Sequence, residues 1–220
     1  PIHIGFNRRF DPSHISTKKR KDKGEIGKLE QIIITSRDPS GPSAAYLKVS
    51  GGMFRDMTIH DFDLACFILQ NDPIVEIFAT GDRLFSEDAK EANDIDTAMI
   101  TMKSKSGVLC HINNSRHSSY GYDQRVELFG SKGMIISDNQ TPTSVTRYND
   151  ESTNSKDPIL NFFIERYDVA YKNQLDNFVN CIIDKKPPTV NFEDGRIALI
   201  IANAAYESLE NKKSVKIDYS

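Results

Sequence analysis

An aspartate and a histidine four residues apart, Asp56 and His60, are the residues whose types and spacing best suit chemistry. Residues at i and i+4 lie on one face of a helix, so the carboxylate and the imidazole would point at the same place. A carboxylate beside a histidine fixes its tautomer, and the free ring nitrogen is then an oriented general base. The alternative is a helix-capping aspartate beside a half-buried structural histidine, and the spacing alone favours this alternative.

The segment that carries the pair is predicted to be a half-buried helix. Its apolar residues Ile59, Phe62, Cys66 and Leu69 recur at helical spacing, as the core-facing stripe of a helix does. Two consecutive glycines stand just upstream. We expect Asp56 and His60 to lie in the first turn of this one helix.

The rest of the chain supplies strands and covering helices. Predicted strands, rich in β-branched and aromatic residues, span 29–37, 74–82, 96–104, 107–115, 122–130 and 134–138. Turn sequences at 103–107 and 130–133 predict an antiparallel meander over 96–138, and 149–158 is predicted to be a mobile loop. Two later helices carry apolar stripes, one through Tyr171, Leu175, Phe178, Val179 and Ile182. We therefore predict an α+β fold with an open-faced, mainly antiparallel sheet and helices on one face.

Composition narrows the class of protein. The 220 residues are 38% hydrophobic and 27% charged, with a net charge of -3, which indicates a globular protein and argues against a nucleic-acid binder. No apolar run approaches the ~20 residues that span a bilayer, and no secretory signal opens the chain, so we expect a cytoplasmic protein that does not enter membranes. The three cysteines form no CxxC pair and the five histidines show no ligand spacing, so no metal site is expected.

The chain opens without methionine in a segment that is predicted to be a strand. Ile2, Ile4 and Phe6 alternate with smaller or polar residues, and Asp11-Pro12 then marks a helix start. A protein seldom begins inside a strand. We therefore expect that a preceding part of the protein is absent from this chain.

Six sequence blocks, in this order, resemble the glucose-fructose oxidoreductase/inositol dehydrogenase/MocA family in the portion after its Rossmann domain, with the inositol 2-dehydrogenases most similar. The blocks are GFNRRFDP (5–12), GEIGK (24–28), SRDP (36–39), GGMFRDMTIHDFDLACFIL (51–69), YGYDQRVELFGSKG (120–133) and FIERYDVAYKNQLDNFV (163–179). The resemblance implies that residues 1–27 are the last strand and helix of a Rossmann domain otherwise absent from this chain. Residues 28–220 would then be the α+β substrate-binding and oligomerisation domain.

The family resemblance also implies an activity. Its members transfer a hydride from a cyclitol or sugar hydroxyl to NAD or NADP, and the implied activity here is that of an NAD-dependent inositol 2-dehydrogenase-like oxidoreductase. The cofactor would be bound mainly by the missing N-terminal domain, because this chain has neither a G-x-G-x-x-G fingerprint nor a Glu-Lys-Pro motif. This chain alone is expected to be inactive. Alternatives are a related sugar or scyllo-inositol dehydrogenase, or a non-catalytic domain that binds a polyol or assembles.

Specific residues follow from the same resemblance. His60 would take the proton from the substrate hydroxyl, and Asp56 would orient the imidazole and bind a hydroxyl. The implied polyol-binding residues are Asn7, Arg8, Asp38, Tyr120 and Tyr122. Asp38 stands where inositol dehydrogenases often have asparagine, and one of the two tyrosines, which strand alternation would place on the same face, is expected to be structural.

Two further expectations concern surfaces. Arg116 and His117 follow a predicted strand and are interpreted as a solvated basic pair in a loop. The family resemblance implies a homo-oligomer, a dimer or tetramer joined through the sheet face. Strand residues such as Val108, Cys110, Ile112, Val126 and Leu128 are expected to contribute to that interface as well as to the core.

Overall fold

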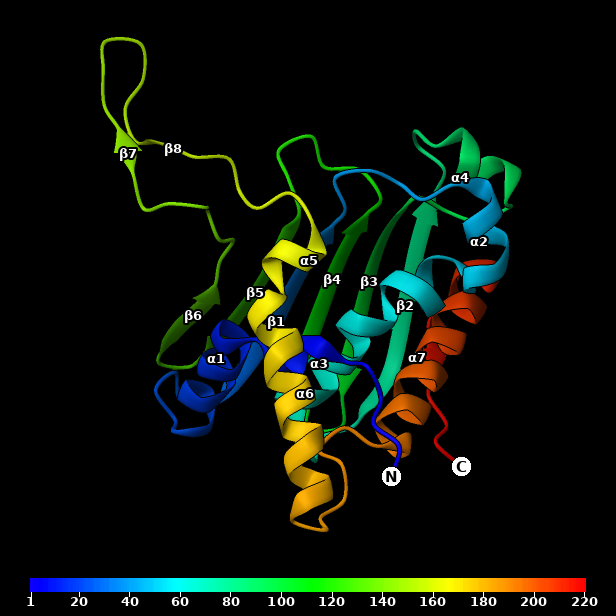
Figure 1. The fold of residues 1–220 in the computed structure, drawn as a ribbon. Helices are drawn as coiled ribbons and strands as arrows, with labels where there is room; N and C mark the ends of the chain where they lie inside the picture. Colours follow the sequence, from blue (N-terminus) through cyan, green and yellow to red (C-terminus); the bar gives the residue numbers. More distant parts are fainter.

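One seven-stranded sheet forms the centre of the computed structural model, which describes residues 1–220 (Figure 1). The strand order is β6-β5-β1-β4-β3-β2-β9. The strands are β1 (Leu29–Arg37), β2 (Ile74–Asp82), β3 (Thr97–Ser104), β4 (Leu109–Ser115), β5 (Asp123–Gly130), β6 (Gly133–Ser137) and β9 (Val215–Lys216).

Strand β1 is an interior strand, third in the order, between β5 and β4. Ile32 pairs with Cys110 of β4 in parallel and with Leu128 of β5 in antiparallel orientation, and all other neighbouring strands are antiparallel. The prediction of a continuous meander over 96–138 is therefore wrong: the β3–β4 and β5–β6 hairpins form, but β1 lies between them. The run Ile32–Ile34 gives β1 apolar side chains on both faces, which suits a central strand.

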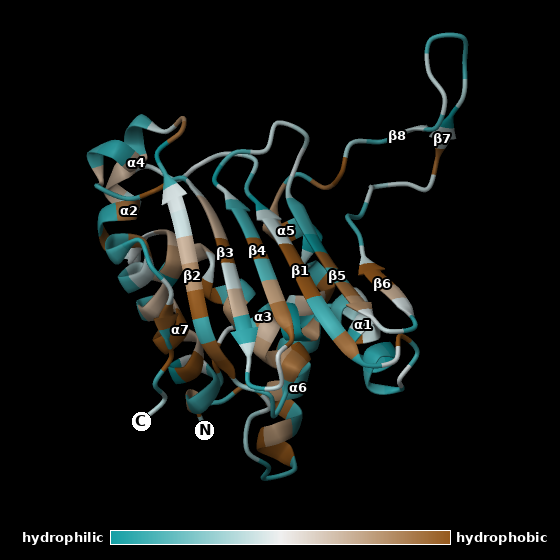
Figure 2. Cartoon of the chain, turned by 180° about the vertical axis from the view of Figure 1, so that it is seen from behind, coloured by the Kyte–Doolittle hydropathy of each residue, from teal (hydrophilic) through white to brown (hydrophobic).

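Helices cover one face of the sheet, and the other face is open. Figure 2, which shows the chain from behind, presents the strands with the helices beyond them. Helix α7 packs on β2 and on α3, and α1 packs on β5 and β6. The helical elements are η1 (Asn7–Phe10), α1 (Pro12–Asp22), α2 (Ala44–Ser50), η2 (Met53–Met57), α3 (Ile59–Leu69), α4 (Glu87–Glu91), α5 (Phe163–Arg166), α6 (Asp168–Ile183) and α7 (Phe192–Asn211). The predicted α+β fold with a mainly antiparallel sheet is confirmed.

Alternation along the strands separates a core face from the open face. In β3, Ala98, Ile100 and Met102 are buried, as the sequence pattern predicts. Five strand residues were expected to contribute to the core and also to an interface. The core part is confirmed and the interface part is wrong, because all five are buried: Val108, Cys110, Ile112, Val126 and Leu128. The open face instead carries the alternate apolar residues Phe78, Met99, Leu109, Phe129, Met134 and Ile136.

Two further expectations from the sequence, for residues 2–6 and for α6, differ from the structure. Residues 2–6 form no strand, because only isolated hydrogen bonds hold them: Ile4 N donates to Val190 O at 3.1 Å. In α6, the apolar stripe that was expected to face the core is largely exposed: Leu175 is 62% and Ile182 50% accessible. The buried residues of this helix are instead Ala170 and Cys181. Assignment of residues 1–27 to the end of another domain stays a prediction.

The polar segment after β6 extends away from the sheet. It forms a small hairpin from β7 (Thr146–Arg147) and β8 (Ser155–Lys156), where a loop without strands was expected (Figure 1). No helix of the chain combines the length and the apolar character that crossing a lipid bilayer requires.

Candidate functional site

A cavity of about 580 Å³ lies where the parallel strands β1 and β4 end. The carboxyl ends of two parallel strands meet at one edge of a sheet, so the residues that follow them lie close together. Asp38 follows β1, and Arg116 follows β4. Elements η1, α2, η2, α3, α5 and α6 contribute further lining residues, as do the loop after β1 and Tyr122 just before β5.

Six of the seven site residues predicted from the sequence line this one cavity: Asn7, Arg8, Asp38, Asp56, His60 and Tyr122. Tyr120 does not. Its ring is half exposed, and its hydroxyl donates to Asp123 Oδ2 at 2.6 Å and accepts from Arg37 at 2.9 Å. The expectation that Tyr120 and Tyr122 alternate on a strand is wrong, since both precede β5.

Asp56 and His60 belong to different helical elements. Asp56 lies in η2, a single π-helical turn closed by a hydrogen bond of 3.0 Å from Thr58 N to Met53 O, and His60 lies in α3. The expected single helix is therefore wrong, although both side chains reach the same cavity. Gly52 begins the turn with φ +75°, and a Cβ there would lie 2.8 Å from Asp94 Oδ1, so only glycine fits this entry.

The His60 imidazole is neutral at neutral pH. Burial and, after it, the positive charge of Arg8 lower its pKa to about 4, against the opposing effect of the Asp61 and Asp56 carboxylates. Nδ1 is buried without a partner, and the edge of the ring packs against Phe6 at a centroid distance of 5.8 Å. The other ring nitrogen, Nε2, is the one open to the cavity, where it can accept a proton.

Asp56 does not hydrogen-bond to His60 in this structure. Its Oδ1 accepts a hydrogen bond from the Tyr46 hydroxyl at 2.7 Å, and its Oδ2 accepts one from Arg116 Nη2 at 2.8 Å. Asp56 therefore acts on the imidazole through its charge, which raises the pKa of His60. The expected fixing of the tautomer by Asp56 is not what this geometry shows.

Arg116 is part of the cavity wall, so the interpretation of a solvated loop arginine is wrong. It is 5% exposed, and it forms ion pairs with Asp56 and, at 3.6 Å, with Asp38. The residues around Arg116 in the sequence are polar, so its burial was not expected. A signal was available nevertheless: Asp38 and Asp56 were both predicted to lie in the site, and two carboxylates that share a site need a nearby cation.

A buried polar network lies beneath the cavity and fixes Arg8. The Arg8 guanidinium donates to the Asp61 carboxylate and, at 3.0 Å, to Ser36 Oγ. Asp61 also accepts from Ser36 Oγ at 2.6 Å and from Asn114 Nδ2 at 2.8 Å. Burial alone would lower the pKa of Arg8, but the Asp61 carboxylate outweighs it and the pKa is raised. Neither Asp61 nor Asn114 was singled out from the sequence.

Aromatic side chains also line the cavity. Phe162, Phe163, Tyr167 and Tyr171 come from α5, α6 and their N-cap residues, and the Tyr167 ring meets Tyr122 edge-on at 6.1 Å. A cavity lined by charged groups, hydroxyls and aromatic rings suits a cyclic polyol, whose hydroxyls form hydrogen bonds while its C–H face packs on a ring.

Comparisons with known proteins agree with this fold. The profile of the GFO/IDH/MocA C-terminal domain matches residues 14–136. The myo-inositol 2-dehydrogenase of Thermotoga maritima is 46% identical over 217 residues, which are 99% of this chain and 64% of that protein. The crystal structure of a myo-inositol dehydrogenase from Corynebacterium glutamicum superposes with a TM-score of 0.95 at 50% identity, covering 99% of this chain and 65% of that one.

A third relative is a structure with ligands. The scyllo-inositol dehydrogenase from Lactobacillus casei, crystallised with bound NAD(H) and scyllo-inositol, superposes with a TM-score of 0.84 at 28% identity, covering 96% of this chain and 63% of that one. This chain thus spans just under two thirds of the length of these relatives. The fold, the profile match and the level of identity agree, and the chain belongs to the GFO/IDH/MocA family through its C-terminal domain.

Proposed function

We propose that this chain is the substrate-binding domain, with the proton-accepting histidine, of an NAD-dependent inositol 2-dehydrogenase-like oxidoreductase. The observation that carries the proposal is a neutral His60 that opens into a cavity lined by hydroxyl-binding side chains. The names of the relatives support inositol as the substrate and NAD as the cofactor. The remaining third of the full-length protein would supply the cofactor domain.

In this proposal, the residues of this chain bind the polyol and manage its proton. His60 Nε2 takes the proton of the substrate hydroxyl as the carbon that bears it becomes a ketone. A nicotinamide cofactor, which residues outside this chain would mainly hold, would supply the hydride acceptor for the same carbon. The imidazolium that forms is stabilised by the charges of Asp61 and Asp56, which raise the pKa of His60.

Recognition of the substrate would depend on a rigid set of donors and acceptors. Arg8 is fixed by Asp61, and Asp56 is fixed by Tyr46 and Arg116. A site built to bind hydroxyls rejects analogues that lack one, because a buried polar group is then left without a partner. Asn7, Asp38 and Tyr122 complete the proposed polyol site.

Oxidation of inositol by the full-length protein tests this proposal. Purified enzyme, NAD and myo-inositol should produce reduced nicotinamide, with scyllo-inositol and NADP measured beside them to define the preferred pair. A glucose 6-phosphate control should give little turnover, because both arginines of the cavity are already paired with carboxylates. Polyol binding without any cofactor reduction would instead support a non-catalytic domain.

We further propose that the protein assembles as a dimer or tetramer through the open face of the sheet. Exposed Phe78, Met99 and Phe129 lie on that face, and contiguous exposed apolar surface is unusual on a monomer. Sedimentation velocity should show an oligomer that Met99→Glu weakens, whereas Val49→Glu on α2 should leave it intact. A monomer in the wild-type protein would refute the assembly.

The free thiols of Cys66, Cys110 and Cys181 support a cytoplasmic location.

A further inference from the structure

We propose that Arg116 is a positioning residue of the polyol site: it clamps Asp38 and Asp56 on one wall so that both carboxylates face the substrate as hydrogen-bond acceptors. The inference rests on the proposed function, because the substrate class comes from it. Arg116 would act through the two carboxylates and need not touch the reacting atoms.

The geometry of the guanidinium supports this role. Its Nη2 donates to Asp56 Oδ2 at 2.8 Å, and its Nη1 lies 3.6 Å from Asp38 Oδ2. Its Nε is buried and has no acceptor in the protein, so the two carboxylates are the only side-chain partners of Arg116. A planar guanidinium with two carboxylates at its two terminal nitrogens fixes their separation, which a single flexible ammonium would not do.

The backbone holds Arg116 in place at the end of β4. Its N–H donates to Asp96 O at 2.8 Å. The fully buried Asp96 carboxylate in turn accepts hydrogen bonds from the backbone amides of Leu84, Phe85 and Ser86, at 2.9 to 3.0 Å. The arginine therefore projects from a rigid strand end into the cavity. Tyr46, from α2, fixes the other oxygen of Asp56.

The electrostatics of Asp38 show what the clamp does. Burial raises the pKa of Asp38 to about 6, and Arg116 is the strongest opposing influence, followed by Arg8. The acidic groups that face Asp38 are Asp56 and Asp61, which raise its pKa further, and the titratable side chains of Tyr46, Tyr122 and His60 line the same cavity. Without the Arg116 charge, the pKa of Asp38 would rise further, so less of this carboxyl would be ionised at neutral pH and available as an acceptor.

Arg116→Met in the full-length enzyme tests the clamp, because it keeps an unbranched side chain and removes the charge. The KM for inositol should rise roughly tenfold to a hundredfold, which is the usual effect of losing a charged hydrogen bond. The acid limb of kcat/KM, expected near pH 6 in the wild type, should move up by about one pH unit. Arg116→Lys should restore the position of the limb but not the whole KM, since the charge returns without the planar fork.

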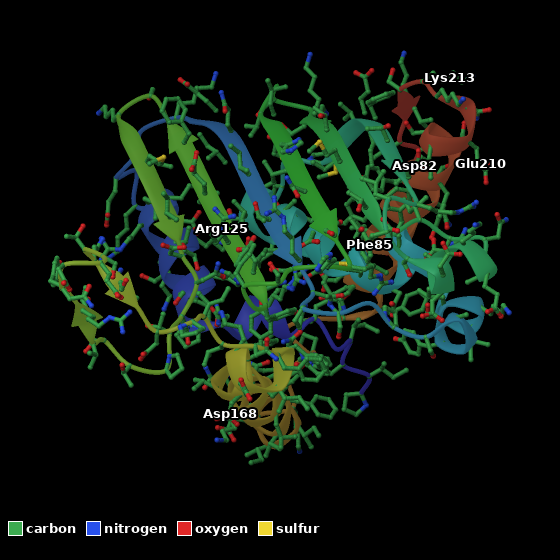
Figure 3. The ribbon with its side chains drawn as sticks, turned by 90° about the horizontal axis from the view of Figure 1, so that it is seen from above. Asp82, Phe85, Arg125, Asp168, Glu210 and Lys213 are labelled. Atoms are coloured by element: carbon green, nitrogen blue, oxygen red, sulfur yellow. The ribbon has the colours of Figure 1, made fainter.

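The control is Arg125→Met. Arg125 also pairs with a buried aspartate, Asp123, at 2.7 Å, but it extends from β5 and does not line the cavity. In the view from above, Arg125 lies on the sheet side of the molecule and Asp168 of α6 on the helical side (Figure 3). This variant should keep the KM and the acid limb of the wild type. Equal effects from both substitutions would reduce Arg116 to a structural residue and overturn the proposal.

Two further measurements keep the test decisive. If Arg116→Met does not fold, Asp38→Asn should remove the acid limb near pH 6, and a limb that stays in place would overturn the proposal. If the wild type does not oxidise inositol, the proposed function fails by itself. Carbon-13 NMR titration of the Asp38 carboxyl in the same proteins then decides on Arg116. A midpoint that rises in Arg116→Met and returns towards the wild-type value in Arg116→Lys supports the clamp, and a midpoint that Arg116→Met leaves unchanged refutes it.

Discussion

Replacement of His60 by alanine should lower the turnover of the full-length enzyme by roughly 10² to 10⁴, the usual effect of removing a positioned general base. Its pKa of about 4 keeps the imidazole unprotonated at neutral pH, so the wild-type enzyme has its proton acceptor ready before substrate arrives. The KM for inositol should change much less than kcat, because other side chains make most of the proposed hydroxyl contacts. Turnover and KM are measured with NAD at saturating concentration.

A structural role for His60 would give a different pair of results. The ring packs against Phe6, so its loss should lower the melting temperature somewhat in either case. Only the catalytic role predicts a large loss of turnover per folded molecule. His117→Ala is the matched control, since His117 is exposed and does not line the cavity. Normal turnover in a well-folded His60→Ala enzyme would remove His60 from the mechanism.

Asp61→Ala should reduce the free energy of unfolding by roughly 3 to 5 kcal/mol, because it leaves the buried guanidinium of Arg8 without its counter-charge. Asp61 is 0% exposed, and the hydrogen bonds from Ser36 and Asn114 are lost with it. The measurement is urea unfolding monitored by circular dichroism, with the slope of the transition checked for two-state behaviour.

A double substitution distinguishes the effect of the unpaired Arg8 charge from the effect of the cavity that Asp61→Ala leaves. Replacing both charges, as Arg8→Met with Asp61→Leu, should recover part of the stability, since no unpaired charge then stays buried. Asp168→Ala breaks an exposed i,i+4 pair with Lys172 on α6 and should change the unfolding free energy by less than about 1 kcal/mol. A loss below about 1 kcal/mol for Asp61→Ala would mean that the Arg8–Asp61 pair does not hold η1 on α3.

The sequence was sufficient for the parts of the fold that depend on local pattern. Alternation in β3 and the turn signals at 103–107 and 130–133 correctly indicated a half-buried sheet and its two hairpins. The place of β1 between those hairpins did not follow, because the pairing partner of a strand is a long-range property. The exposed stripe of α6 was misjudged for a similar reason, since periodicity locates an apolar face but not what covers it.

Prediction of the candidate site was limited in the same way, because contacts between distant segments do not follow from local sequence patterns. The resemblance to the family directed attention to Asp56, His60 and Asp38, which the structure brings into one cavity. It did not single out Arg116, whose ion pairs with the two aspartates exist only after β1 and β4 have paired in parallel. The π-helical turn of η2 was also unforeseen, because five residues carry no periodic signal of their own.

The position of β1 between the two hairpins also has a consequence for how the chain folds. Ile32 must find Cys110 and Leu128, which are distant along the chain, whereas β3–β4 and β5–β6 are joined by short turns. Closing a long segment costs entropy before its contacts form, so folding is slower when the central pairings are remote. The two hairpins are kinetically accessible early, but each exposes an unpaired edge until β1 enters between them. Those edges are the surfaces through which partly folded chains of this protein would aggregate.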